Sequence, residues 1–210
     1  MTTDNPRRAL VMLTRAPRAG RVKTRIAKAL GDAKALAIHR ELTERAAAAA
    51  RAVRDTQLVV AHTPADAGDE MRAWLGNDFR YEPQRGSDLG QRMAAAIEER
   101  LSSGADRVIV IGSDAPDLTT EMIEEAFDAL GGADVVVGPA ADGGYYLIGM
   151  GTLQRSLFER IPWSGPETLA RTLAAIRAAG LRLHLLEILR DVDTAEDWRD
   201  WARRNGRLAD

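Results

Sequence analysis

The sequence predicts an α/β protein whose sheet is mostly parallel and is covered by helices on both faces. Short apolar runs bounded by turn residues recur along the chain, such as ALVMLT at 9–14 and RVIVIG at 107–112, and segments with helical patterns lie between them. Continuous apolar strands are typical of parallel sheets that are buried on both faces. In such folds ligands bind beyond the carboxyl ends of the strands, so the loops that follow strands are the places to search for function.

The expected strands, in chain order, are Ala9–Thr14, Gln57–His62, Phe79–Glu82, Arg107–Gly112, Asp134–Gly138, Tyr145–Met150 and Leu181–Leu186. The expected helices are one that starts near Val22, then Asp32–Arg54, Asp66–Leu75, Asp88–Leu101, one from Thr119 or Thr120 to near Leu130, Leu153–Arg160, Pro166–Ala179 and Thr194–Arg203. Asp and Thr at the starts of several of these helices can accept hydrogen bonds from free backbone N–H groups, as helix N-caps do.

The overall composition is that of an ordinary globular protein. At 210 residues and 45% apolar content, the chain is expected to form a single domain, 1–210. It contains no cysteine, which excludes disulfides and thiolate sites and is compatible with a cytoplasmic location. No apolar run is long enough for a membrane span, and the net charge of −2 argues against a nucleic-acid-binding protein. The sequence does not indicate an oligomeric state.

Positive charge is concentrated at the start of the chain. Residues 1–31 hold eight bases and one acid, a net +7, whereas residues 32–210 hold 21 bases and 30 acids, a net −9. The loop after the first expected strand contains Arg15, Arg18, Lys23 and Arg25 together with Gly20, although it lacks the GxxxxGK[ST] and GxGxxG patterns. Several cations in one loop repel each other unless an anion is bound, so a polyphosphate ligand and a solvated charged surface are both open alternatives for this loop.

Acidic residues follow two other expected strands. Asp114 and Asp117 lie in GSDAPDLT after the 107–112 strand, and Asp191 and Asp193 lie in RDVDTAEDW near the end of the chain. Asp114 is placed where Mg²⁺ or Mn²⁺ could bridge protein and phosphate oxygens, whereas Asp117 is placed to cap the next helix. Asp191 and Asp193 alternate, so one is expected to face the site and the other to face away. Helix capping is the alternative role for Asp193.

Two glycine-containing loops complete the candidate site. In GPAADGGYYLIG, Gly143 and Gly144 permit either a close backbone approach to a nucleotide or a tight turn, and Asp142 could bind an acceptor hydroxyl or a metal. In QRGSDLGQRM, Gln84 offers a donor and an acceptor to a base edge, and Gly86 lets a planar base lie against the backbone. Among the aromatic residues, Trp163 in the irregular segment IPWSGP is a candidate wall for an acceptor site.

Six segments distributed along nearly the whole chain carry a resemblance to a known family. They are GRVKTRIAKALG, QRGSDLGQRM, IGSDAPDLT, VVVGPAADGGYYLIGM, LFERIPWS and DVDTAEDW. In this order they resemble the small bacterial GT-A-fold transferases, in particular the arsenosugar-biosynthesis-type glycosyltransferases, which are related to 2-phospholactate guanylyltransferase and other nucleotidyltransferases. The resemblance implies a three-layer α/β/α GT-A fold, that of the nucleotide-diphospho-sugar transferases. It also implies that Tyr145–Met150 is an antiparallel strand in a mixed sheet.

The same resemblance implies roles for individual residues, namely metal binding by Asp114 and Asp193, phosphate binding by Lys23 and Arg25, and base contact by Gln84 with Gly86. The metal would be Mg²⁺ or Mn²⁺. The chain departs from many GT-A glycosyltransferases because no D-x-D follows the fourth strand; SDAPD spaces its acids by three. This departure keeps nucleotidyl transfer as a close alternative.

The leading hypothesis is a metal-dependent transferase that moves a glycosyl group from a nucleotide sugar to a small-molecule acceptor. Arg15, Arg18, Lys23 and Arg25 would neutralise the diphosphate, and Asp142 would orient or deprotonate the acceptor hydroxyl, so that Lys23, Arg25 and Asp142 form the expected catalytic set. The alternative is a nucleotidyltransferase that moves NMP from an NTP to a phosphorylated small molecule and releases pyrophosphate. A further alternative is a catalytically inactive nucleotide-binding regulatory protein.

Overall fold

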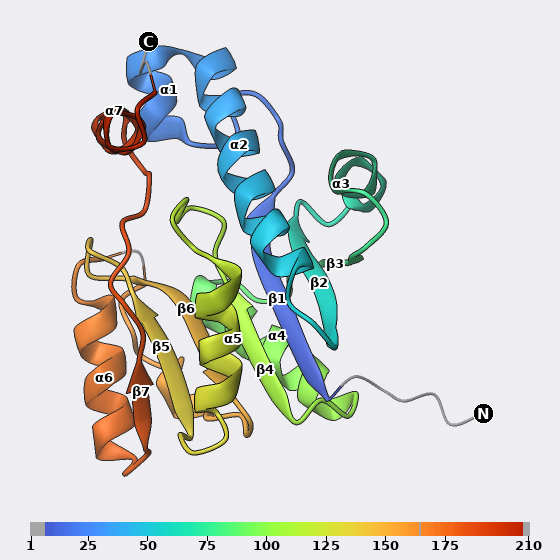
Figure 1. Ribbon diagram of the computed structural model, residues 1–210, viewed down its shortest axis with the longest axis vertical. Helices are drawn as coiled ribbons and strands as arrows, with labels where there is room; N and C mark the ends of the chain where they lie inside the picture. Colours follow the sequence, from blue (N-terminus) through green and yellow to red (C-terminus); the bar gives the residue numbers. More distant parts are fainter. Residues whose placement is uncertain (1–6, 164, 208–210) are drawn as a thin grey trace.

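A seven-stranded mixed sheet forms the centre of the structure, a computed structural model that describes residues 7–163 and 165–207 (Figure 1). Its strands are β1 (Arg8–Arg15), β2 (Thr56–Thr63), β3 (Arg80–Pro83), β4 (Arg107–Ile111), β5 (Val135–Pro139), β6 (Tyr145–Met150) and β7 (Leu183–Leu185). Their order across the sheet is β3-β2-β1-β4-β6-β5-β7. The expected α/β fold with a mostly parallel mixed sheet is confirmed.

Strand direction places the loops of interest at one edge of the sheet. β1 pairs in parallel with both β2 and β4, β2 with β3, and β5 with β7. β6 alone among these strands runs the opposite way, between β4 and β5, as the family resemblance implies. The carboxyl ends of the parallel strands and the start of β6 therefore share one edge. The strand order reverses between β1 and β4, which is where α/β sheets bind ligands.

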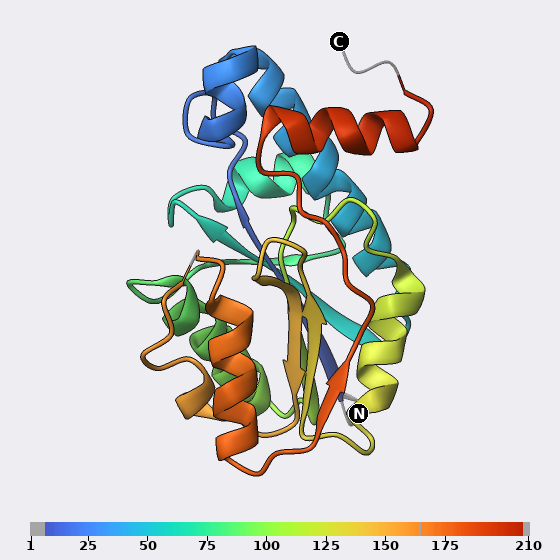
Figure 2. The same cartoon turned by 90° about the vertical axis from the view of Figure 1, so that its left-hand side faces the viewer.

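The helices cover both faces of the sheet because the strand residues alternate between two apolar layers (Figure 2). In β4, Ile109 and Ile111 point into one layer, and Val108 and Val110 point into the other. The first layer packs against α2 (Asp32–Arg51), α3 (Gly68–Leu75) and α5 (Thr120–Ala129). The second packs against α4 (Leu89–Ser102) and α6 (Thr168–Ala178). Burial on both faces is the reason that the strand sequences are continuously apolar.

A third apolar cluster lies beyond the edge of the sheet that bears the loops. It joins α1 (Thr24–Leu30) and the first half of α2 to α7 (Ala195–Arg204), the last helix. Ile26 and Ile38 pack there against Trp198 and Trp201, and Val192 belongs to the same cluster. This packing brings the basic loop after β1 close to the C-terminal segment that carries Asp191 and Asp193 (Figure 1).

Most expected elements are present, with ends that differ by a few residues. Asp88, Thr119 and Thr194 each cap the following helix, and Thr194 forms a capping box with Asp197. Asp32, the first residue of an expected helix, begins α2 but does not cap it, because Gly31 is the N-cap residue.

The expected helix Leu153–Arg160 is wrong. The structure has only a short 3₁₀ turn there, η1 (Arg155–Leu157). Arg160 adopts a left-handed conformation with φ 58°, and Pro162 disfavours a helical conformation at the residue before it. The apolar periodicity in this segment instead reflects two buried residues, Leu157 and Phe158. Among the described residues, no helix combines the length and the apolarity needed to cross a bilayer.

Candidate functional site

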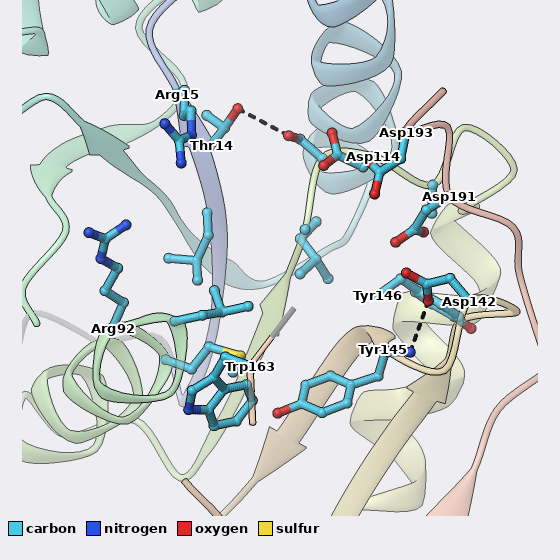
Figure 3. Close-up of a pocket in the computed structure, with 18 of the residues that line it drawn as sticks. Thr14, Arg15, Arg92, Asp114, Asp142, Tyr145, Tyr146, Trp163, Asp191 and Asp193 are labelled. Carbon is cyan, nitrogen blue, oxygen red and sulfur yellow. Dashed lines mark hydrogen bonds between the residues drawn. The ribbon is translucent and has the colours of Figure 1, made fainter. Parts of the chain in front are cut away.

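The loops at the carboxyl edge of the sheet surround a cavity of about 540 Å³. It lies over the ends of β1 and β4 and the start of β6. The cationic residues that line it are Arg15, Arg21, Lys23, Arg25 and Arg92, and the acidic residues are Asp114, Asp142, Asp191 and Asp193. Figure 3 shows Arg15 and Arg92 on one side of the cavity and the four aspartates on the other. The side of the cavity with Arg15 and Arg92 is therefore cationic, and the side with the aspartates is mainly acidic, although Lys23 lies there too.

Two hydroxyl groups contact each other at the place where the strand order reverses. Thr14 near the end of β1 and Ser113 just after β4 are both buried, and their hydroxyl oxygens lie 3.1 Å apart (Figure 3). This contact fixes the spacing between the two strand ends. It thereby fixes the distance between the basic loop that follows Thr14 and the acidic loop that begins at Asp114.

Lys23 is the residue at which the basic and acidic loops meet. Its ammonium nitrogen lies 2.8 Å from Oδ1 of Asp114 and 3.0 Å from Oδ1 of Asp193, and it donates to the carbonyl oxygen of Val192 at 2.7 Å. The Lys23 side chain is only 6% exposed. Burial lowers the pKa of Lys23, but the charges of Asp114 and Asp193 outweigh this effect, so its pKa lies above the usual value and the ammonium stays charged.

Asp191 lies beside this ion-pair cluster and carries an unusual carboxyl group. Burial is the main cause that raises its pKa to about 7, and the negative charges of Asp114, Asp142 and Asp193 raise it further. Its Oδ1 atom is buried and has no hydrogen-bond partner among the described residues. The expectation that only one of Asp191 and Asp193 faces the site is wrong: both line the cavity. The segment between Leu189 and Thr194 is irregular, so side chains there do not alternate as in a strand.

Asp142 is more exposed than Asp191, in the loop between β5 and β6. Its Oδ1 accepts a hydrogen bond from the backbone N–H of Gly144 at 2.9 Å (Figure 3), which fixes the carboxylate at the rim of the cavity. The expected positions of Asp142 and Gly144 at the site agree with this geometry. Gly143 does not line the cavity. It has φ 91°, and a Cβ there would lie 2.1 Å from the carbonyl oxygen of Pro166, so its glycine is required by chain packing.

Arg15 and Arg18 lie in the same loop but have different surroundings. The backbone carbonyl of Arg15 accepts a hydrogen bond from Nε2 of buried His39 at 3.0 Å, and its guanidinium lines the cavity. Burial lowers the pKa of His39, so this imidazole is neutral and acts as a support for the loop. Arg18 is not among the lining residues, because its guanidinium pairs with Glu70 of α3 at 2.9 Å.

Gln84 joins the ends of two strands. Its amide nitrogen donates to the carbonyl oxygens of Thr14 at 2.9 Å and Ala61 at 2.8 Å, and its Oε1 accepts from Arg92 at 3.3 Å. A contact between Gln84 and a base would therefore use the carbonyl oxygen and not the amide hydrogens. Gly86 lies outside the cavity lining, against Gln91 of α4.

Trp163 forms part of the apolar floor of the cavity (Figure 3). Its ring stacks on Phe158 with centroids 6.5 Å apart and meets Tyr145 edge-on at 6.3 Å. The indole also lies against Gly90 of α4, where an added Cβ would be 2.2 Å from the ring. Its expected position as a wall of the site agrees with these contacts.

The structure thus brings together eight of the eleven residues expected at the site: Arg15, Lys23, Arg25, Gln84, Asp114, Asp142, Gly144 and Asp193. Arg21, Arg92 and His39 also line the cavity, although the sequence patterns predict no site role for them. Arg92 is part of the QRGSDLGQRM segment, where its place one turn after the Asp88 cap could have indicated it. His39 lies inside a long helical pattern that gives no sign of a nearby loop.

A match to a known sequence family identifies the family of this chain. The profile of a family described as "uncharacterized protein conserved in bacteria (DUF2064)" matches residues 46–165. The chain belongs to the DUF2064 family. The part of the chain that matches DUF2064 contains the Asp114 and Asp142 loops, whereas Lys23 and Asp193 lie outside it. No curated protein matches the sequence.

Solved structures extend the comparison beyond DUF2064. A Desulfovibrio desulfuricans protein assigned to the nucleotide-diphospho-sugar transferases has 32% sequence identity and a TM-score of 0.90, over 95% of this chain and 87% of its own. A 4-diphosphocytidyl-2C-methyl-D-erythritol synthase from Anaerococcus prevotii has 11% identity and a TM-score of 0.63, over 97% of this chain and 98% of its own. The inositol-1-phosphate CTP transferase from T. maritima has 13% identity and a TM-score of 0.57, over 90% and 91%. These likenesses confirm the GT-A-type fold.

Proposed function

We propose that this protein is a metal-dependent transferase that uses a nucleotide sugar and moves the glycosyl group to a small acceptor. The observation that carries the proposal is the shared cavity, which is lined both by the cations of the loop after β1 and by Asp114 and Asp193. The likeness to a nucleotide-diphospho-sugar transferase at 32% identity over nearly the whole chain supports an enzyme of this kind.

The arginines of the loop after β1 that line the cavity fit a diphosphate. Arg15, Arg21 and Arg25 are all exposed and line the cavity, so their guanidinium groups are accessible to an anion that enters it. Arginine binds phosphate oxygens through two parallel N–H donors, which positions as well as neutralises the group. The diphosphate becomes the leaving group when the bond from the anomeric carbon to its oxygen breaks and the acceptor oxygen attacks that carbon. The proton of the acceptor hydroxyl would pass to Asp142, which is fixed at the rim by Gly144.

The donor set on the acidic side fits Mg²⁺ or Mn²⁺. Among the described residues, no group of three or more His, Asp or Glu side chains is arranged to hold a metal. These metals, however, are commonly held by one or two carboxylates together with substrate phosphates. Asp114 and Asp193 already share one cation, the Lys23 ammonium, and the buried Oδ1 of Asp191 lacks a partner beside them. When bound, the metal would neutralise the negative charge that develops on the leaving diphosphate.

The cation load of the same cavity favours a second candidate function, nucleotidyl transfer from an NTP to a phosphorylated acceptor. A triphosphate and an acceptor phosphate carry more negative charge than a nucleotide sugar, and Arg92 of α4 adds a further cation to the cavity. Solved structures that share the fold include a CTP transferase. The cytoplasmic location stays a prediction.

The two candidates release different products, so one experiment separates them. The protein is incubated with Mg²⁺, a panel of labelled nucleotide sugars or NTPs, and a panel of small hydroxylated and phosphorylated acceptors. Release of a nucleoside diphosphate from a nucleotide sugar supports glycosyl transfer, and release of pyrophosphate from an NTP supports nucleotidyl transfer. Tight nucleotide binding without either product would support the inactive regulatory protein instead.

A further inference from the structure

The three hydrogens of the Lys23 ammonium have three oxygen partners. They are Oδ1 of Asp114, Oδ1 of Asp193 and the carbonyl oxygen of Val192, at 2.8, 3.0 and 2.7 Å. An ammonium group has three donors and no more, so none is left for a phosphate in this arrangement. Lys23 therefore occupies a different position from Arg21 and Arg25, whose exposed side chains line the cavity and have no ion pair with these aspartates among the described residues.

A divalent metal and this ammonium compete for the same two carboxylates. Magnesium binds oxygen at about 2.1 Å, so a metal that takes Oδ1 of both Asp114 and Asp193 needs the space between them. Two cations this close together, one of them on a side chain that is only 6% exposed, repel each other. The Lys23 side chain must consequently leave the carboxylates when a metal binds to both.

Lys23 has a place to go within the same cavity. Lys23 is the residue immediately before α1, and its backbone has φ 44° and ψ 48°. In the chain it lies between Arg21 and Arg25, which both line the cavity. A long, flexible side chain at this point can turn from the aspartates toward a bound phosphate by rotation about its own bonds, without a shift of the helix.

We propose that Lys23 is an internal counter-ion of the metal site: it keeps Asp114 and Asp193 together when no metal is present and opposes the binding of metal alone. A nucleotide bound with the metal offers the displaced ammonium a new anionic partner, its phosphate. Metal and nucleotide therefore bind with positive coupling, and Lys23 is the residue through which they are coupled. This inference rests on the proposed function, because it takes Asp114 and Asp193 as metal ligands.

The test measures the affinity for Mn²⁺ alone, without any turnover. Free Mn²⁺ is followed by electron paramagnetic resonance as it is titrated with wild type, Lys23→Met and Arg25→Met, each with and without an NDP and an NTP. Methionine keeps the length of the lysine stem and removes the charge. Arg25→Met is the matched control, because it removes a cation from the same cavity but not from the aspartates.

We expect Lys23→Met to bind Mn²⁺ alone about tenfold more tightly than wild type, a typical size for coupling between two sites. We also expect the nucleotide to enhance Mn²⁺ binding less in this variant than in wild type. Arg25→Met should bind Mn²⁺ alone within about threefold of wild type, since its exposed charge is screened by solvent and salt. Circular dichroism on each variant verifies that it is folded. Lys23→Gln serves as a second substitution that removes the charge.

Two results would overturn the inference. If folded Lys23→Met and Lys23→Gln bind Mn²⁺ no more tightly than wild type, or if Arg25→Met gains as much affinity, Lys23 does not act as a specific counter-ion, while the proposed function stands. If wild type binds no Mn²⁺ even with nucleotide, the metal-dependent function fails, and the inference fails with it.

Discussion

The indole N–H of Trp201 donates a hydrogen bond to Oδ1 of Asp117 at 2.9 Å, and this contact joins α7 to the loop that carries Asp114. Arg204 lies 3.4 Å from the other oxygen of the same carboxylate. Trp201 is 1% exposed, so its N–H has no access to solvent. Asp117 therefore has a structural role in fixing the C-terminal segment, in contrast to Asp114, three residues earlier, which faces the cavity.

Substitution Asp117→Ala should destabilise the protein. The buried indole N–H would lose its acceptor, which costs about 1–3 kcal/mol of unfolding free energy. Urea unfolding followed by circular dichroism measures this cost. The matched control is Asp142→Ala, which should change stability by less than about 1 kcal/mol because this side chain is exposed and forms no ion pair among the described residues. Equal stability losses in the two variants would show that Asp117 has no special structural role as the acceptor of the Trp201 indole N–H.

Asp191→Asn should stabilise the metal-free protein at high pH but not at low pH. In the folded protein the pKa of Asp191 is raised from 3.8 to about 7, mainly by burial, so ionisation of this carboxyl opposes folding. The loss of unfolding free energy that this ionisation causes is absent below pH 3.8, increases as the pH rises toward 7 and reaches its full size above that value. A shift of this size corresponds to on the order of 4 kcal/mol.

Urea unfolding of Asp191→Asn and wild type in EDTA, at intervals between pH 4 and pH 8, measures this difference. The gain in unfolding free energy should appear mainly between pH 4 and pH 7. Asp142→Asn is the control, since Asp142 belongs to the same acidic cluster but is exposed, and its effect should be small at every pH. A gain for Asp191→Asn that is the same at all pH values would show that ionisation of the buried carboxyl is not its cause.

Gly90→Ala should destabilise the protein although alanine favours helix by about 1 kcal/mol over glycine. The new Cβ would lie 2.2 Å from the Trp163 indole, a contact that forces the ring away from α4 and out of the floor of the cavity. Overpacking of this kind costs about 1–3 kcal/mol. Thermal unfolding of Gly90→Ala, alone and combined with Trp163→Ala, tests the explanation. When Trp163 is already alanine, Gly90→Ala should no longer destabilise the protein, and the double variant should be more stable than Trp163→Ala alone. No loss in the single variant would mean that the ring moves freely.

The strands and most helix starts could be predicted because they depend on local patterns. The RVIVI run of β4 is apolar since both of its faces are buried, and Asp88, Thr119 and Thr194 cap helices through contacts within three residues. The opposite direction of β6 could not be derived from such patterns; it came from the resemblance to a family.

The details of the site could not be predicted because they depend on contacts between distant segments. Lys23 and Asp193 are 170 residues apart in the chain, and they meet because α1 and α7 share an apolar cluster. The amide of Gln84 binds the backbone of β1 and β2, which no pattern in its own segment indicates. Asp191 faces the cavity because its segment is irregular, where the alternation rule for strands does not apply.

The central claim is that Asp114 and Asp193 hold a metal that binds a nucleotide together with the cations of the loop after β1. Isothermal titration of nucleoside diphosphates and triphosphates into wild type and Asp114→Asn, with Mn²⁺ or with EDTA, tests it most directly. We predict that wild type binds at least one nucleotide at least about tenfold more tightly with Mn²⁺ than with EDTA, and that Asp114→Asn loses this difference while it remains folded. Nucleotide binding that is indifferent to Mn²⁺ in wild type, or that depends equally on Mn²⁺ in Asp114→Asn, would contradict the claim.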